Sequence, residues 1–357
     1  MPTEMISLHF LSVFSLISFF IALLIHKISH KLFKGLLLDE DFNKPQAFHN
    51  LSVPRAGGLF SIISLSFFFI LNYFLFDSLF YEYLIITFSL FLLGFLDDIK
   101  FNISPKTRLI LMIAILIISI LFFSIEIERI DFWFISYILQ FKVLNIIFVL
   151  LCFLFIINGA NLIDGFNGLL AIHLIIINLI LLSINLNKNI EQDFTIFITA
   201  QIIVLLIFLL FNFPRAKIFL GDSGAYLFGS LTVLNVIKTN NLNPEITSFF
   251  FCIILFYLFF EVFFSFFRKI LNKKSPLKPD DKHFHMLLFK SLKSKGIFTE
   301  NNYMTSIIIN IIFIILISPA LFLKSSSFHL AWFFTLLLIY LIGYFFILKN
   351  KSTQNFD

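Results

Sequence analysis

Long apolar runs separated by short polar loops constrain this chain more than any other feature. Of its 357 residues, 59% are hydrophobic and only 13% are charged, and the mean hydropathy is +0.99. An ordinary soluble domain has about 25% charged residues. Runs of about 20 apolar residues are long enough to cross a bilayer as helices. We therefore expect an all-α, polytopic integral membrane protein with one transmembrane domain over residues 1–357.

The hydropathy pattern predicts about eleven transmembrane helices. Their ranges are 5–25, 57–76, 80–96, 107–125, 143–158, 166–186, 194–213, 223–238, 246–267, 303–323 and 328–348. We read the first as a retained helix, because it has no basic leading segment and no small-residue cleavage site. Cys152 and Cys252 both fall inside apolar runs, so the sequence indicates no disulfide framework.

The distribution of Lys and Arg predicts the orientation. With the N-terminus outside, the inner segments hold 21 of the 26 basic residues and the outer segments hold 5. Cytoplasmic loops carry this excess. We therefore expect a periplasmic N-terminus and a cytoplasmic C-terminus, in a bacterial inner membrane. The net charge of +5 reflects this asymmetry and gives no reason to expect nucleic acid as a partner.

Five polar clusters all fall on the predicted inner side. They are HNLSVPRAGG (49–58), LDDIK (96–100), NGANLIDGFNG (158–168), FLGDSGA (219–225) and KSPLKPDDKHFH (274–285). They are dispersed over more than two hundred residues, yet one membrane face would bring them together. This arrangement is typical of an enzyme with its active site on the cytoplasmic face.

Aspartates stand out in two of the clusters. Asp97 and Asp98 are adjacent at a membrane interface, where two carboxylates repel each other unless a cation is near. A solvated helix end is the plainer interpretation, although the C-terminus of a helix disfavours acids. Asp222 begins a helix; it could cap that helix or supply an oxygen ligand for Mg²⁺.

The 158–168 cluster places Asn158, Asn161, Asp164 and Asn167 at steps of three. Each such step drifts by about 60° on a straight helix, so the four cannot share one face. We expect the first three to line one site and the chain to turn afterwards, with Gly165 as the place for the break. An Asn-rich loop from biased composition is the alternative.

His283 and His285 lie two residues apart in a loop with nine Lys or Arg (268–302), which predicts an extended segment that binds phosphate. Zinc lacks supporting ligands, and solvated loop histidines are the alternative. Glu261 lies inside the preceding span, where an acid indicates a functional role. Arg55, with His49 nearby, offers a guanidinium beside a flexible glycine pair.

Together these motifs resemble the polyprenyl-phosphate N-acetylhexosamine-1-phosphate transferases of glycosyltransferase family 4, which includes the WecA-like branch and the phospho-MurNAc-pentapeptide translocase. The resemblance covers about residues 39–290. The patterns H-x4-P-R-x-G-G, D-D, N-x-x-N-x-x-D-G-x-[DN]-G, G-D-x-G and S-P-x4-D-x-x-H-x-H occur here in that order.

Some positions depart from the family pattern. Asn167 stands where many members have a second Asp, Ala225 where Ser is common, and Met286 where a further His often follows. NKPQAFH replaces a segment usually rich in P-N-x-R, and the H-H-H-F-E signature of the translocase is absent. These departures favour the branch that initiates surface polysaccharides over peptidoglycan synthesis, and the translocase is the second reading.

The resemblance implies transfer of a sugar 1-phosphate from a UDP-sugar to undecaprenyl phosphate, with release of UMP. Two anionic substrates must meet, so a cation should offset their repulsion. The implied cofactor is Mg²⁺, with Mn²⁺ as an alternative ion. The implied partners are UDP-N-acetylhexosamine, undecaprenyl phosphate and membrane lipids; whether the chain forms a homodimer stays open.

The resemblance also assigns roles to individual residues. Catalysis falls to Asp97, Asp98 and Asp222, and Mg²⁺ binding to Asp222 and Asn161. Substrate binding falls to the remaining polar residues, which are His49, Arg55, Asn158, Asn161, Asp164, His283 and His285.

Two other classes of membrane protein fit the sequence less well. A transporter with a carboxylate relay would place acids inside its spans near the midplane, whereas only Glu261 lies there. A CDP-alcohol phosphotransferase would follow Asp164-Gly165 with Ala-Arg and further spaced aspartates, which this chain does not.

Overall fold

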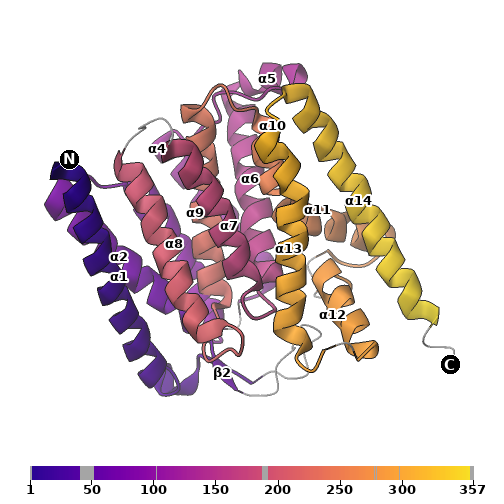
Figure 1. Cartoon of the computed structure of the whole chain (residues 1–357), viewed down its shortest axis with the longest axis horizontal. Helices are drawn as coiled ribbons and strands as arrows, with labels where there is room; N and C mark the ends of the chain where they lie inside the picture. The colour runs from indigo at the N-terminus through magenta and orange to yellow at the C-terminus, as the bar shows by residue number, and fades with distance from the viewer. Residues whose placement is uncertain are drawn as a thin grey trace.

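The computed structural model describes residues 2–40, 52–101, 103–186, 192–276, 278, 280–296 and 298–353, and these form a helical bundle (Figure 1). Its longer helices are α1 (Pro2–Ile28), α2 (Gly57–Phe76), α3 (Tyr81–Asp98), α4 (Pro105–Phe123), α6 (Lys142–Ile163), α7 (Leu169–Leu186), α8 (Gln192–Asn212), α9 (Gly221–Leu242), α13 (Asn301–Phe322) and α14 (Ser326–Thr353). Shorter elements are η1 (Leu32–Gly35), β1 (Leu38–Asp39), β2 (Val53–Pro54), α5 (Trp133–Leu139), α10 (Ser248–Ile254), α11 (Phe256–Leu271) and α12 (Phe284–Ser294).

Every predicted span corresponds to helix in the structure. Among the described residues, eight helices are long and apolar enough to cross a membrane, and the bent pair α10 and α11 would make nine. The other two predicted spans, 80–96 and 223–238, fall on α3 and α9, which carry more polar side chains. The all-helical, multi-pass architecture is confirmed, and the count of eleven stays a prediction.

Helix α9 explains why a polar helix can stand among apolar ones. It packs against α2, α3, α6, α7 and α10, so nearly all of its side chains are buried by protein. Its buried Asn235 amide donates to Asn178 of α7 and Gln201 of α8 at 3.1 and 2.8 Å. Inside a membrane such amides must be satisfied by other protein groups. A helix surrounded in this way needs little apolar surface of its own.

The predicted continuous span 246–267 is wrong as one helix, because α10 and α11 meet at a 73° bend beside Leu255. The sequence gives no Gly or Pro to signal it. On α11, however, Glu261 and Ser265 are spaced by four and are buried on one face. The bend turns this polar face towards the loop that precedes α12, instead of towards lipid.

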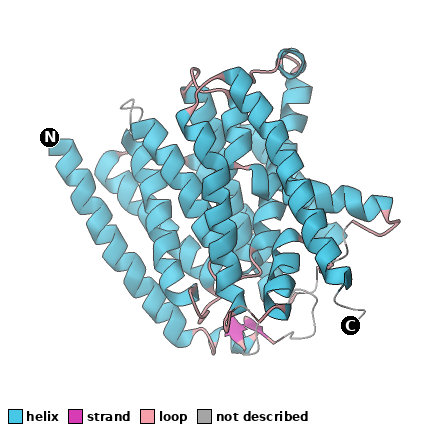
Figure 2. Cartoon of the chain, turned by 45° about the vertical axis from the view of Figure 1, so that its right-hand side comes forward, coloured by secondary structure: helices cyan, strands magenta, loops and turns pink. Residues whose placement is uncertain are grey.

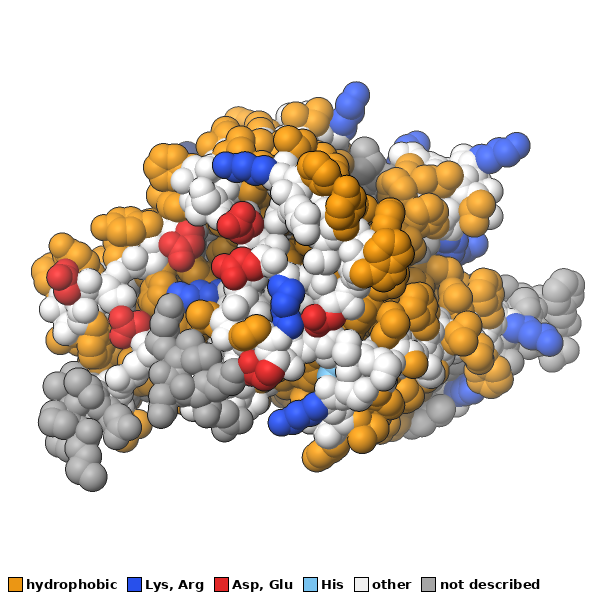
Figure 3. Space-filling model, turned by 90° about the horizontal axis from the view of Figure 1, so that it is seen from above, with side chains coloured by type: hydrophobic (Ala, Val, Ile, Leu, Met, Phe, Trp, Pro, Cys, Tyr) orange, Lys and Arg blue, Asp and Glu red, His pale blue; other side chains and the backbone are white. Residues whose placement is uncertain are grey.

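The bundle has two distinct ends. The N-terminus of α1 and the C-terminal end of α14 lie at opposite ends of it (Figure 1). Helix α5 lies across one end, where Figure 3 shows acidic side chains together with Lys and Arg side chains. The strands β1 and β2 lie at the other end (Figure 2). The polar motifs gather at this second end, which we call the strand end.

Candidate active site

The two short strands bring Arg55 to the first turn of α9. Strand β1 pairs antiparallel with β2, and the Arg55 backbone N–H donates to the carbonyl of Leu37 at 2.8 Å. The Phe219 N–H in turn donates to the carbonyl of Pro54 at 2.9 Å. The Arg55 guanidinium then donates to Asp39 through two nitrogens, at 3.1 and 2.8 Å. Its remaining nitrogen, Nη1, lies 3.8 Å from a carboxylate oxygen of Asp98.

Asp98 joins α3 to α9. One of its carboxylate oxygens accepts the backbone N–H of Asp222 at 2.9 Å, and the other accepts the N–H and the hydroxyl of Ser223. Gly221 makes this approach possible, because its φ is +78° and a Cβ there would lie 2.6 Å from an Asp98 oxygen. The Asp98 side chain is fully buried, so it holds the start of α9 in place.

Arg108 lies between Asp97 and Asp222. Its Nη1 nitrogen donates to Asp97 at 2.7 Å and to Asp222 at 2.6 Å, and the guanidinium lies 5.9 Å from the ring centre of Tyr226. Sequence reasoning missed this residue. The signal was its place in the first turn of α4, where the helix dipole disfavours a cation.

The 158–168 segment behaves as expected in one respect. Helix α6 ends at Ile163, Asp164 is its C-cap, and the chain then turns. Asn167 points elsewhere, since its side chain donates to the carbonyl of Pro214 at 2.8 Å. Asn158, the last residue of the predicted span, and Asn161, beyond that span, both lie inside α6. The Asn158 amide donates to the carbonyl of Leu154 in its own helix.

The electrostatics of the strand end couple these aspartates. Burial and the Asp222 charge raise the pKa of Asp98 to about 7, and burial raises that of Asp222 to about 6 although Arg108 opposes it. The pKa of Asp164 is raised well above its usual range by burial and by the same two carboxylates. Burial would lower the pKa of Arg55, but Asp98, Asp222 and Asp39 raise it overall. Carboxylates crowded in this way favour a further cation.

Residues 280–285, which lead into α12 and which we call the histidine loop, form the second half of the site. The ring of His285 lies 5.7 Å from that of Phe166, which belongs to the turn after Asp164. The Nδ1 of His285 lies 3.3 Å from the hydroxyl of Tyr257, and its buried Nε2 has no hydrogen-bond partner among the residues that the structure describes. Burial lowers the pKa of His285 to about 3, so this imidazole is neutral.

His283 has a different environment. Its Nδ1 lies 3.1 Å from Glu261 and its Nε2 3.2 Å from Asp280. Burial opposes the charge, but these two carboxylates raise the pKa of His283 overall. With an acceptor on each side, both nitrogens donate as an imidazolium.

The prediction of an extended segment holding both histidines is wrong. His283 is the N-cap of α12 and His285 lies in its first turn. The phosphate role of both residues stays a prediction. His49 falls outside the described residues.

A magnesium ion fits part of this arrangement. Within the described ranges, no three His, Cys, Asp or Glu side chains form a ready-made metal site. Mg²⁺ often binds through one or two carboxylates, with water and substrate phosphate completing its shell. Asp97 and Asp222 face the same Arg108 nitrogen, so they could supply such a pair.

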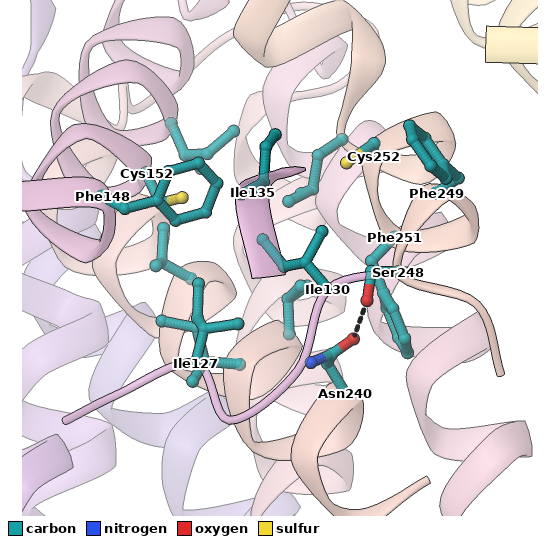
Figure 4. A pocket seen from close by; sticks show the side chains of 15 residues that line it. Ile127, Ile130, Ile135, Phe148, Cys152, Asn240, Ser248, Phe249, Phe251 and Cys252 are labelled. Atoms are coloured by element: carbon teal, nitrogen blue, oxygen red, sulfur yellow. Dashed lines mark hydrogen bonds between the residues drawn. The ribbon is translucent and has the colours of Figure 1, made fainter. Parts of the chain in front are cut away.

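One apolar cavity, of about 160 Å³, lies away from the polar site at the strand end (Figure 4). It lies beneath the α5 end and is lined by α6, α9 and α10, including the free thiols of Cys152 and Cys252. Along α9 its lining residues, 233–240, are more than ten positions from Asp222. At about 1.5 Å per residue, this cavity is distinct from the polar site.

The fold and the site together define a multi-pass membrane protein with a charged site built from several helices. Residues 80–240 match the family described as glycosyl transferase family 4. An undecaprenyl-phosphate alpha-N-acetylglucosaminyl 1-phosphate transferase of Thermotoga maritima is 30% identical over 68% of this chain and 70% of its own length.

Two further relatives were found. A probable undecaprenyl-phosphate N-acetylglucosaminyl 1-phosphate transferase of Bacillus subtilis is 30% identical over 71% of this chain and 68% of its own length. A phospho-N-acetylmuramoyl-pentapeptide-transferase of Dictyoglomus turgidum is 31% identical over 63% of this chain and 74% of its own length. The chain belongs to glycosyl transferase family 4, and it is a phosphotransferase.

Proposed function

We propose that this enzyme transfers N-acetylhexosamine 1-phosphate from a UDP-sugar to undecaprenyl phosphate, as the initiating step of a cell-surface polysaccharide. The observation that carries the proposal is the pairing of Arg55 and Arg108 with buried and partly exposed aspartates at the strand end. Arginine recognises phosphate through its planar array of donors. The names of the two bacterial N-acetylglucosaminyl transferases support the same substrates.

The proposed reaction balances as a simple displacement. An oxygen of undecaprenyl phosphate attacks the sugar-bearing β-phosphorus of the UDP-sugar. The bond from this phosphorus to the bridging oxygen breaks, and that oxygen leaves with UMP. The products are undecaprenyl diphosphate-sugar and UMP. Little covalent chemistry is asked of the protein, so positioning and charge neutralisation do most of the catalysis.

The residues at the strand end have separate proposed tasks. Arg55 and Arg108 bind phosphate oxygens, and Arg108 shifts its hydrogen bonds from Asp97 and Asp222 to substrate. Those two aspartates would hold Mg²⁺, which would offset the negative charge of the phosphates. Asn161 and Asp164 contact the nucleotide-sugar. Asp98 acts through its hold on α9 and on Arg55.

The assay for this function uses the purified full-length protein in detergent, with undecaprenyl phosphate and UDP-N-acetylglucosamine or its galactosamine epimer. UMP release and a lipid-linked radiolabelled sugar should appear together. No lipid product from any UDP-N-acetylhexosamine would remove the proposal.

The peptidoglycan reaction is the second candidate, because one relative carries the phospho-N-acetylmuramoyl-pentapeptide name. The same assay with UDP-N-acetylmuramoyl-pentapeptide separates the two. We expect no turnover of that donor.

The proposed setting is the bacterial inner membrane, with the strand end facing the cytoplasm. The segments assigned to that side hold 21 of 26 Lys and Arg residues. UDP-sugars are cytoplasmic metabolites, so the donor would reach the site from this side.

A further inference from the structure

Glu261 of α11 is a buried junction between three helices. Its side chain is only 1% exposed. One oxygen, Oε1, receives the His283 imidazole at 3.1 Å and the backbone N–H of Phe284 at 3.0 Å. The other, Oε2, accepts the hydroxyl of Tyr340 at 2.6 Å. A buried carboxylate needs all of these donors, so its orientation is fixed jointly by α11, α12 and α14.

Helix α14 holds the same short segment at two further points. The Tyr344 hydroxyl donates to the carbonyl of Lys282 at 3.0 Å, and the rings of Tyr340 and Phe284 lie 5.4 Å apart. The last long helix thus contacts Lys282 and Phe284, the two neighbours of His283 at the entry to α12.

That entry is coupled to the polar site. The imidazole rings of His283 and His285 are nearly parallel, with centres 5.7 Å apart, and His285 packs against Phe166 beside Asp164. A change in the angle of the His283 ring would therefore move His285 against the turn that presents Asp164.

We propose that Tyr340 is a positioning residue for catalysis: through Glu261 it orients His283, and through His283 it seats the histidine loop against the turn at Asp164. Tyr340 touches no substrate in this scheme. The inference rests on the proposed transferase function, because the effect of substituting Tyr340 is measured as sugar-phosphate transfer.

The test begins with Tyr340→Phe, which removes one hydroxyl and keeps the ring. Loss of a hydrogen bond to a charged group is worth about 1.5–3 kcal/mol, which corresponds to roughly a 10- to 150-fold change. We expect kcat to fall about tenfold or more, with the KM for the UDP-sugar changed less than threefold. A thermal unfolding scan in detergent should show a folded protein.

Trp332→Phe is the matched control. The Trp332 indole on the same helix donates to the carbonyl of Leu316 in α13 at 2.9 Å, away from Glu261. This variant weakens the docking of α14 without touching the junction, so its kcat should stay near the wild-type value. Equal losses of kcat in the two variants would mean that Tyr340 only helps to dock α14 against the other helices.

A double mutant decides whether Tyr340 acts through His283. In a His283→Ala background, Tyr340→Phe should have little further effect on kcat, because the group it positions is gone. Full additivity would overturn the proposal. If Tyr340→Phe does not fold, Tyr344→Phe replaces it, with a smaller loss that His283→Ala also suppresses. Inactivity of the wild type would instead count against the proposed function.

Discussion

The carboxylate of Asp98 receives both the backbone N–H and the hydroxyl of Ser223, and so ties the end of α3 to the first turn of α9. Its neighbour Asp97 has a different environment, being partly exposed and paired with Arg108. Of the two adjacent acids in the D-D motif, Asp98 therefore has a structural role and Asp97 has a chemical one.

This division predicts different outcomes for two substitutions. Asp98→Ala leaves three donors without an acceptor in a buried place, and each such group costs about 1–3 kcal/mol. We expect a clear loss of thermal stability in detergent. Asp97→Asn should unfold at nearly the wild-type temperature yet lose transfer at least a hundredfold. Equal melting temperatures for both variants would contradict the structural role of Asp98.

Asp222 tests the metal proposal. Asp222→Asn should fold in the membrane and almost abolish transfer, because an amide is a far poorer Mg²⁺ ligand than a carboxylate. Wild-type transfer should also stop in EDTA and return with Mg²⁺ or Mn²⁺. Full turnover in the chelator would rule the ion out.

Substitutions of Arg108 should show whether the site needs only a positive charge there or also the planar guanidinium. Arg108→Lys keeps the charge but lacks the planar fork of donors with which a guanidinium binds phosphate through two nitrogens. We expect it to lose about 10- to 100-fold in transfer, the worth of one or two charge-assisted hydrogen bonds. Arg108→Gln should lose more. The measurement is kcat/KM for both substrates, and wild-type values in Arg108→Gln would remove this residue from the site.

His283 predicts a pH dependence of stability. Its pKa in the folded protein is raised by Asp280 and Glu261, despite burial. The stabilisation from the imidazolium is therefore fully present below its ordinary pKa of about 6.5, and it is lost as pH rises through the higher folded value. Melting temperatures of the wild type and His283→Gln should converge as pH increases from 6 upwards. A difference that grows with pH would contradict this environment.

Orientation can be tested with reporter fusions. A fusion after Lys295 should report a cytoplasmic location and one near Asn187 a periplasmic location, because 21 of 26 basic residues fall on the inner segments. The opposite result at either point would place the motifs on two sides of the membrane.

Much of this arrangement could be predicted from hydropathy and polar spacing. The eleven predicted segments are all helical, and Arg55, Asp97, Asp98, Asp164 and Asp222 do meet at one end of the bundle. Both follow from a simple constraint, since apolar runs must cross and polar loops must gather at the faces.

Other features depend on packing that no local pattern encodes. The bend beside Leu255 has no Gly or Pro, and it arises where α11 turns its polar face to the histidine loop. The bond from Tyr340 to Glu261 joins positions 79 residues apart. Arg108 had a signal in its unfavourable helix position, but its partner Asp222 is 114 residues away.

The contacts of α14 have a consequence for biogenesis. Translation runs from the N-terminus, so residues 55–285 leave the ribosome well before Tyr340 and Tyr344. Until these two tyrosines arrive, Glu261 lacks one of its donors and Lys282 lacks its restraint. A nascent chain stalled before α14 would have its aspartates and arginines in place but a loosely held histidine loop. Maturation of the site would then coincide with insertion of the last long helix.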